Sequence, residues 1–409
     1  MWKRVALSLA LVCASLMLAE GALQVAVRIS PAVERLLSGK PAKSAGVPRL
    51  LRDERLKVRG NPAWRHHDAN GYRNPAVPVR ADLVALGDSQ TYGVGVGKRE
   101  NWPAVLAGDT GLTVYNMGVD GYGPAQSELE LPRALSLSPD TVVVAVYFGN
   151  DLFDAFDMAT RHTEIAALVD PELLAEARAL EAASPFSRQV GTLFQQAVRG
   201  NSGKGTKQSP WPAWVREHVK LYALGRRLMA VGLKKPPSIL SARTFSEAAA
   251  ALTGERLKWA SAYDGPEWRT LLTGAYRAPA VDDGDVRIRA GFEVIREVLP
   301  RMQRQVEAAG AELLVLLIPT KESVFVPRVS DPEAHVGFSG LVENEARLKA
   351  ELRARLDAEG IAVVDALGPL VAAVEQPYPV NADGHPNPFG HRVIAGAVAA
   401  WLNAGKRGG

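Results

Sequence analysis

Four short, glycine-bearing turns hold side chains whose types fit the chemistry of acyl transfer. Such chemistry needs a hydroxyl nucleophile, a base that takes its proton, a carboxylate that orients the base, and donors for the oxyanion. Ser89 follows Gly87 and Asp88 and can supply the hydroxyl. His385 can take its proton and later return it, and Asp383, two residues earlier, can hold the imidazole tautomer. We therefore expect Ser89, Asp383 and His385 to be catalytic.

Two further turns offer donors for the oxyanion. One spans residues 116–121 (NMGVDG), and the other is residues 149–151 (GND). The backbone N–H groups of Ser89 and Gly121, together with the side-chain amide of Asn150, are the donors that we expect. A glycine at position 121 would let the backbone approach the substrate without a Cβ in the way.

Three of these turns follow strands of a predicted α/β fold, whereas the fourth, residues 383–387, precedes the last predicted helix and could reach the same edge of the sheet. Residues 141–148 (TVVVAVYF) form a continuous β-branched run, as expected for a parallel strand that is buried on both faces. Strand and helix patterns alternate, which implies one flavodoxin-like parallel sheet of about five strands with helices on both faces. Ligands bind beyond the carboxyl ends of such strands, so the turns should meet at one edge. The predicted strands are 82–86, 112–115, 141–148, 312–318 and 361–365, and the predicted helices are 102–107, 126–137, 286–309, 342–359 and one after 390.

The α/β pattern stops over residues 155–285. This segment holds helical stretches and a polar linker at 200–210. We interpret 155–285 as a mainly helical insertion that leaves the sheet at the catalytic edge and caps the site entrance. The catalytic domain then comprises 81–154 and 286–409. Residues 30–80 are rich in proline and charge, and we interpret them as a juxtamembrane stretch.

The N-terminal residues 1–29 carry a membrane-targeting pattern. Residues 5–19 are apolar or small, follow the basic pair Lys3-Arg4, and are continued by further apolar residues. The first run alone fits a signal peptide, whereas the whole stretch is long enough to span a bilayer. An uncleaved anchor, which we favour, and a cleaved signal both place the rest outside the cytoplasm, on the periplasmic side of an inner membrane. Cleavage would make the protein secreted.

The charge distribution argues against a nucleic-acid-binding protein, and the cysteine content excludes a fold held by disulfides within the chain. The net charge of the 409 residues is +4, and the charges are scattered without a nucleic-acid motif, so we expect no nucleic-acid partner. The single cysteine, Cys13, cannot form a disulfide within the chain.

Taken in order along the chain, the four turns resemble the sequence blocks of the SGNH/GDSL hydrolases. The resemblance covers about 82–150 and 286–403 and implies the SGNH hydrolase fold. It also implies a serine hydrolase that acts on an ester-bearing substrate, with no cofactor and no metal. The matching blocks are residues 87–91 (GDSQT), 116–121, 149–151 and 383–387 (DGHPN), and the four residues that give the family its name would be Ser89, Gly121, Asn150 and His385.

The last block departs from the spacing of many family members. They place the acid three residues before the histidine, where this chain has Ala382. The Asp-x-His spacing resembles the branch that contains alginate O-acetyltransferases and related enzymes of cell-surface polysaccharides. Residues 318–322 (IPTKE) and the N-terminal anchor resemble that branch too. This resemblance implies acetyl-ester chemistry on a glycan.

Three functions remain open on the sequence. The first is an esterase or deacetylase that acts outside the cytoplasm on acyl, by expectation acetyl, esters of a glycan. The second is a polysaccharide O-acetyltransferase that uses the same acyl-enzyme. The third, a non-catalytic glycan-binding module, has no need of all three catalytic side chains.

Several residues compete with these assignments. His391 is the rival of His385, but it lies inside the last predicted helix, where packing or capping is its expected role. Residues 66–68 (HHD) look like a metal cluster without a second ligand group, so we favour a solvated loop. Lys321 and Glu322 follow a predicted strand and either reach the site or form a surface pair.

Aromatic residues of the insertion have two interpretations as well. They could line a substrate cleft, but we favour the core of a helical cap. The basic segment 214–233 could touch lipid headgroups, but a solvated helix is favoured. The residues are Trp211, Trp214, Trp259 and Trp268.

Overall fold

The computed structural model describes residues 2–30, 33, 47–186, 213–222, 224 and 239–405. The chain divides into two compact units. The first comprises Met1–Pro48 and Asn201–Pro236, and the second comprises Arg49–Gly200 and Pro237–Gly409. The linker expected at 200–210 and Trp211 lie outside the described residues.

The first unit contains one long apolar helix, α1 (Trp2–Ile29), and the short helix α10 (Ala213–His218). The stretch Ala10–Ile29 has a mean hydropathy of 1.8 and is long and apolar enough to cross a bilayer. Membrane anchors and signal sequences share these properties. Within this unit the Glu20 carboxylate accepts the backbone N–H groups of Lys220 and Leu221, each at 2.8 Å.

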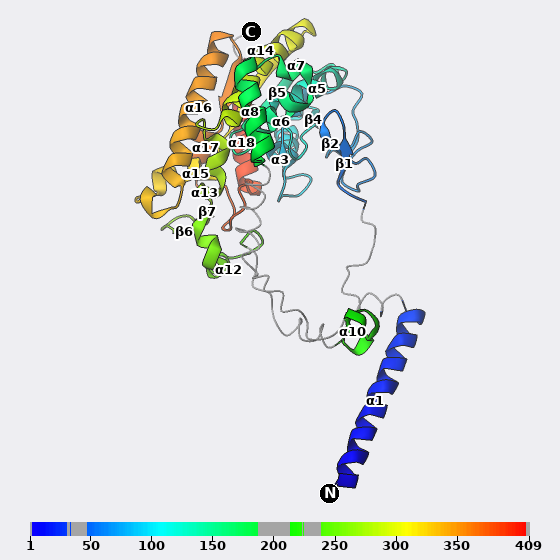
Figure 1. The fold of residues 1–409 in the computed structure, drawn as a ribbon. Coiled ribbons are helices and arrows are strands. Elements are labelled where there is room, and N and C mark those ends of the chain that lie inside the picture. The colour runs from blue at the N-terminus through cyan, green and yellow to red at the C-terminus, as the bar shows by residue number, and fades with distance from the viewer. Residues whose placement is uncertain are drawn as a thin grey trace. The chain divides into compact units, whose positions relative to one another are not determined.

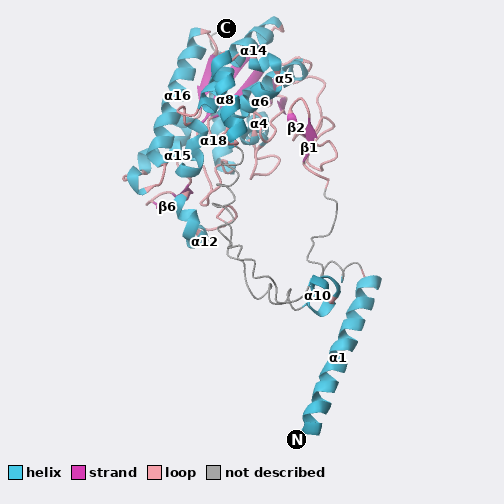
Figure 2. Ribbon diagram, in the orientation of Figure 1, coloured by secondary structure: helices cyan, strands magenta, loops and turns pink. Residues whose placement is uncertain are grey.

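A five-stranded parallel sheet lies at the centre of the second unit, with the order β4-β3-β5-β8-β9. Figure 2 shows helices on both sides of these strands. The α/β fold expected from the sequence is therefore confirmed, and the observed strands overlap all five predicted ones. Their bounds are β3 (Leu83–Leu86), β4 (Val114–Asn116), β5 (Thr141–Tyr147), β8 (Glu312–Ile318) and β9 (Ala362–Asp365).

Side chains of the sheet alternate between two apolar cores, as the pleat requires. Val142, Val144 and Val146 of β5 enter one core, whereas Val143 and Ala145 enter the other. Helices cover both faces (Figure 1). The first core is closed by α5 (Pro124–Leu135), α6 (Asp151–Arg161), α8 (Pro171–Ala183), α14 (Val286–Ala308) and α16 (Phe338–Ala358), and the second by α4 (Trp102–Thr110), α15 (Lys321–Phe325), α17 (Leu367–Val371) and α18 (Pro388–Gly405).

Residues 49–80, which belong to the stretch that we interpret as juxtamembrane, lie in the same compact unit as the sheet. They bury Tyr72 in the first core, and the Asn74 side chain exchanges two hydrogen bonds of 2.9 Å with the backbone of Asn116. Such side-chain-to-backbone bonds leave no hydrophobic period in the sequence, so the packing was not predictable. The segment begins with a hairpin of β1 (Leu50–Asp53) and β2 (Lys57–Gly60).

The described parts of the insertion are mainly helical but also contain a two-stranded hairpin. The described residues 155–186 and 239–285 of the insertion both belong to the second unit. Besides α8 and the end of α6, the insertion contributes α7 (Thr163–Ala166), α12 (Phe245–Ala251), β6 (Ser261–Asp264), β7 (Arg269–Leu272), α13 (Gly274–Arg277) and two 3-10 turns, Gly254–Lys258 and Ala278–Val281.

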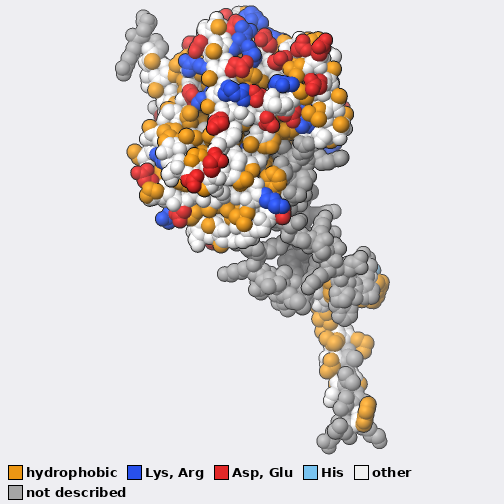
Figure 3. Space-filling model, turned by 60° about the vertical axis from the view of Figure 1, so that its left-hand side comes forward, with side chains coloured by type: hydrophobic (Ala, Val, Ile, Leu, Met, Phe, Trp, Pro, Cys, Tyr) orange, Lys and Arg blue, Asp and Glu red, His pale blue; other side chains and the backbone are white. Residues whose placement is uncertain are grey.

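Charges on the face of the second unit drawn in Figure 3 are interspersed, with Lys and Arg beside Asp and Glu over most of the surface.

Candidate active site

Ser89 begins a tight turn at the carboxyl end of β3. Gly87 has φ of +153°, and a Cβ there would lie 2.5 Å from Thr91 Oγ1, so glycine is required between strand and helix. Asp88 caps α3 (Ser89–Tyr92), because its Oδ1 accepts the Gln90 N–H at 2.8 Å. This cap fixes the backbone and leaves the Ser89 side chain at the edge of a pocket.

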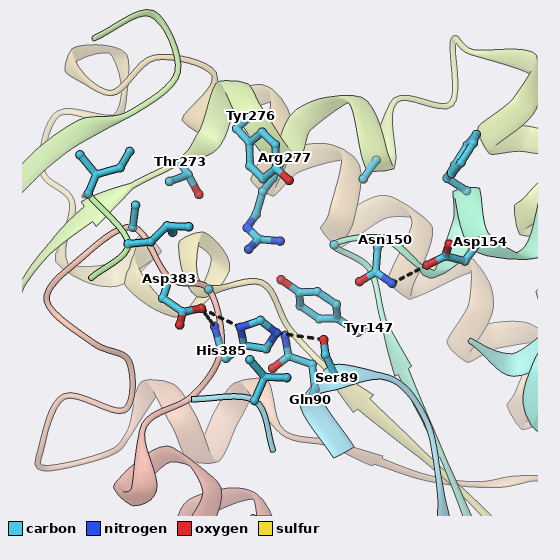
Figure 4. Close-up of a pocket in the computed structure, with 18 of the residues that line it drawn as sticks. Ser89, Gln90, Tyr147, Asn150, Asp154, Thr273, Tyr276, Arg277, Asp383 and His385 are labelled. Carbon is cyan, nitrogen blue, oxygen red and sulfur yellow. Dashed lines mark hydrogen bonds and ion pairs between the residues drawn. The ribbon is translucent and has the colours of Figure 1, made fainter. Parts of the chain in front are cut away.

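A chain of hydrogen bonds joins the three residues that the sequence singles out for catalysis. Ser89 Oγ lies 2.9 Å from His385 Nε2, and His385 Nδ1 lies 2.6 Å from Asp383 Oδ1. Figure 4 shows this line of side chains along the floor of the pocket. Residues 296 positions apart in the sequence thus form the geometry of a nucleophile, a base and an orienting acid.

The charge of Asp383 sets the tautomer of its neighbour. Burial raises the pKa of Asp383, but its hydrogen bonds with the His385 side chain and backbone outweigh burial and hold the pKa below its usual value. The carboxylate is therefore ionised at neutral pH and accepts from Nδ1–H. Nε2 is left with a lone pair that faces the Ser89 hydroxyl, as proton abstraction requires.

Lys321 ties the loop that carries this acid and base to the rest of the fold. Its Nζ donates to the carbonyl oxygens of Leu271 at 2.6 Å, Asn381 at 2.9 Å and Asp383 at 3.3 Å. Lys321 and Glu322 are both fully buried, so their interpretation as a surface pair is wrong. Sequence could not show this, because their partners come from distant segments.

Burial of Lys321 makes stability depend on pH in a defined direction. Desolvation lowers its pKa from 10.5 to about 8, so between these values the unfolded chain binds more protons and stability rises with pH. We expect the free energy of unfolding of the wild type, relative to Lys321→Met, to rise by about 3 kcal/mol between pH 8 and pH 10.5. Urea unfolding at several pH values measures the difference.

The matched control is Lys258→Met, since the Lys258 side chain is 64% exposed. Its free energy of unfolding should follow that of the wild type across the same range. A constant difference between the wild type and Lys321→Met would show that the buried amine does not titrate in this window.

Of the three predicted oxyanion donors, two lie at the pocket that contains the Ser89 hydroxyl. Ser89 and Asn150 line the pocket, whereas Gly121 is not among its lining residues. Gly121 has φ of +78°, in the left-handed region, and no atom lies within 4 Å of where a Cβ would stand. The N–H of Ser89 belongs to the first helical turn, where such groups have no partner within the helix.

A hydrogen bond followed by an ion pair connects the Asn150 amide to Lys57. Its Nδ2 donates to Asp154 Oδ2 at 2.8 Å, and Asp154 Oδ1 lies 3.5 Å from Lys57 Nζ. Lys57 lies in the β1–β2 hairpin and also pairs with Asp157 at 2.9 Å. The hairpin thus fixes a side chain of the pocket.

The competing histidines have other partners. His391 is fully buried, and its Nδ1 accepts the N–H of Trp102, the first residue of α4. Burial lowers its pKa to about 3, so it is neutral and caps a helix. His67 contacts Asn61 O at 2.9 Å and Tyr92 Oη at 3.0 Å. Residues 66–68 therefore form part of a packed turn, which corrects the expectation of a solvated loop.

The pocket has a volume of about 660 Å³. Its wall includes residues of the segment that we interpret as the insertion, such as Phe186, Ile239 and Arg277. Neither of the two described tryptophans that the insertion contributes to the second unit, Trp259 and Trp268, lines it, and Trp268 lies in the second core. Sequence gave no signal for the insertion residues of the pocket, because no motif marks them.

Part of the chain is similar to a known protein family. The sequence profile of the GDSL-like Lipase/Acylhydrolase family matches residues 85–233, about a third of the chain. The match includes the Ser89 turn and extends into the insertion. It does not distinguish branches within the family, such as the alginate O-acetyltransferases. A comparison with curated protein sequences gives no match.

Solved structures with a similar arrangement include three with low identity. They are phospholipase A1 from Streptomyces albidoflavus NA297 (11% identity, 78% of this chain and 99% of that one, TM-score 0.37), the carbohydrate acetylesterase Est24 from Sinorhizobium meliloti (12%, 80% and 99%, 0.32) and a GDSL-like lipase from Bacteroides thetaiotaomicron VPI-5482 (11%, 79% and 88%, 0.31). At these TM-scores the similarities carry no argument about function. Over residues 85–233 the chain is similar to the GDSL-like Lipase/Acylhydrolase family, also called the SGNH hydrolases, and this similarity supports a hydrolase that acts on ester bonds.

Proposed function

We propose that the protein is a serine esterase that removes acetyl groups from a cell-surface glycan through Ser89, His385 and Asp383. The observation that carries the proposal is the hydrogen-bonded line from Ser89 Oγ through the imidazole to the Asp383 carboxylate, opening on a pocket. Ser89 Oγ attacks the acyl carbon as His385 takes its proton, and the imidazolium then protonates the departing alcohol. Water then attacks the acyl carbon of the acyl-enzyme as His385 takes a proton from it. The bond from that carbon to Ser89 Oγ breaks, and His385 returns the proton to Ser89 Oγ.

The sequence and the pocket together support an acetylated glycan as the substrate. The Asp-x-His spacing resembles enzymes of cell-surface polysaccharides, and the apolar helix α1 would hold the chain at a membrane as an anchor. A pocket of about 660 Å³ is far larger than an acetyl group, so most of it is available for the alcohol part of the ester.

One experiment separates the proposed esterase from the alternatives. The full-length protein in detergent micelles is incubated with an activated acetyl ester and with acetylated oligosaccharides, with and without free oligosaccharide acceptors. An esterase releases acetate and does not acetylate the acceptor, as mass spectrometry of the glycan will show. Acetylated acceptor would identify a transferase, and no turnover of any acetyl ester would refute both activities.

The Asn150 amide is expected to act in the transition state. We expect Asn150→Ala to lower kcat by about 10²–10³-fold with little change in KM, because oxyanion donors bind the developing charge more strongly than the ground state. Steady-state kinetics on the activated acetyl ester measure both constants. Asn344→Ala, on α16 and outside the pocket lining, serves as the control. A change confined to KM would assign Asn150 to substrate positioning instead.

A further inference from the structure

Arg277 brings a positive charge into the pocket and forms no ion pair with any residue that the structure describes. It ends α13, and Figure 4 shows its guanidinium directed into the pocket, above Tyr147 and His385. Among the residues that the structure describes, no carboxylate oxygen lies within 4.0 Å of its nitrogens, and its buried Nε has no hydrogen-bond partner. A guanidinium presents a rigid, planar set of donors that matches a carboxylate, so one that forms no ion pair inside a pocket is suited to bind an anionic group.

The Tyr147 hydroxyl is a second unused donor in the same place. The Tyr147 side chain is only 2% exposed and lines the pocket, yet its hydroxyl has no hydrogen-bond partner in the described part of the chain. Burial raises the pKa of Tyr147, so the hydroxyl keeps its proton and can donate. Arg277 Cζ lies 5.8 Å from the centre of the tyrosine ring. Buried polar groups are rarely left without a partner, and here two donors share one cavity.

The two acids whose charges act on Arg277 have other partners, although among the described residues Glu322 Oε2 accepts no hydrogen bond. Glu322 Oε1 accepts the N–H of Thr273 at 2.6 Å and its hydroxyl at 2.9 Å, and Asp383 holds His385. Burial on its own would lower the pKa of Arg277, but Tyr147 and these two acids raise it, so the guanidinium stays charged. It is therefore available as a cation for a group that enters the pocket.

Arg277 lies on the side of the pocket from which the alcohol part of the ester would leave. A Cβ on Gly384 would lie 2.2 Å from Arg277 Nη2, so the guanidinium rests against the backbone between Asp383 and His385. His385 gives its proton to the leaving alcohol, which consequently departs on this side of the pocket. A charged group on the alcohol would be within reach of Arg277, whereas the acyl group bonds to Ser89.

We propose that Arg277 and the Tyr147 hydroxyl bind a carboxylate carried by the alcohol part of the substrate, such as the acid group of an acidic sugar. The proposal rests on the proposed function, because the leaving side is defined by His385. The two residues take no part in the bond changes. Ser89 Oγ bonds to the acyl carbon, the bond from that carbon to the alcohol oxygen breaks, and His385 supplies the proton to that oxygen.

A pair of substrates that differ only in charge tests the proposal. The full-length protein in detergent micelles is given para-acetoxybenzoate, whose alcohol part carries a carboxylate, and para-acetoxybenzamide, which is neutral. The measured quantity is the ratio of kcat/KM for the acid to kcat/KM for the amide. Since hydrogen bonds to charged groups contribute about 1.5–3 kcal/mol, the ratio for Arg277→Gln should be about 10–100-fold below that of the wild type.

Further variants assign the effect to the two donors. Arg277→Lys keeps the charge without the planar set of donors and should retain part of the preference, and Tyr147→Phe should lower the ratio several-fold. These two variants decide the matter if Arg277→Gln does not fold. Arg289→Gln removes an equal charge from an exposed position and should leave the ratio unchanged.

Failure of this inference can be told apart from failure of the proposed function. Hydrolysis of both esters with a ratio that Arg277→Gln, Arg277→Lys and Tyr147→Phe leave unchanged would overturn the carboxylate site alone. A preference for a carboxylate on the acyl group, measured with phenyl succinate against phenyl butyrate, would overturn it too. No hydrolysis of any of the four esters by the wild type would overturn both.

Discussion

Replacing Ser89 by alanine should abolish ester hydrolysis and leave the fold unchanged. The Ser89 Oγ is 2.9 Å from the only described imidazole that lines the pocket, and without it no acyl-enzyme can form. Loss of the nucleophile of a catalytic triad lowers kcat on the order of 10⁴-fold or more. The rate on an activated acetyl ester, measured beside the melting temperature of the same preparation, tests the expectation.

Ser136→Ala is the matched control for this variant. Ser136 is exposed at the end of α5, and its hydroxyl donates only to the carbonyl of Arg133 at 2.7 Å. Its loss should change neither activity nor melting temperature appreciably. A folded Ser89→Ala protein with near wild-type activity would remove Ser89 from the mechanism.

His385 and His391 should respond in opposite ways to alanine. His385→Ala removes the base between Ser89 and Asp383, so its loss of kcat should approach that of Ser89→Ala. His391→Ala removes the acceptor for the Trp102 N–H in a buried position, which should lower the free energy of unfolding by about 1–3 kcal/mol while kcat stays within a few-fold. Kinetics and urea unfolding of both variants provide the comparison.

Two further measurements examine whether the three residues act as a unit. The losses from Ser89→Ala and His385→Ala should not add in the double variant, because both residues serve one step. Asp383→Asn should also be severe, since an amide in place of the carboxylate favours the wrong imidazole tautomer. If His391→Ala silenced the enzyme and His385→Ala spared it, the base would have to be reassigned.

The sheet and the Ser89–His385 pairing were predictable because their signals are local. A buried parallel strand such as β5 is a run of β-branched residues, and three of the four glycine-bearing turns directly follow predicted strands. The carboxyl ends of parallel strands meet at one edge whatever their order. The order of the strands was not predictable, since it depends on how helices pack between distant segments.

The rest of the pocket could not be predicted for a related reason. Arg277 and Tyr147 act through contacts between the insertion and the sheet, and no motif marks either residue. Lys57 reaches Asp154 from a hairpin whose sequence is polar and lacks a period. Burial of Lys321 depends on carbonyl oxygens from segments about 50 and 60 residues away. Side-chain-to-backbone contacts over such separations leave no trace in local sequence patterns.

Covalent trapping of the nucleophile tests the central claim most directly. The full-length protein is treated with a phosphonate reagent that forms a stable bond to an activated serine, and the modified peptide is identified by mass spectrometry. We expect one modification, on Ser89, formed rapidly in the wild type and far more slowly in His385→Ala, because the imidazole activates the hydroxyl. Modification of another residue, or labelling of Ser89 at the same rate in both proteins, would contradict the account.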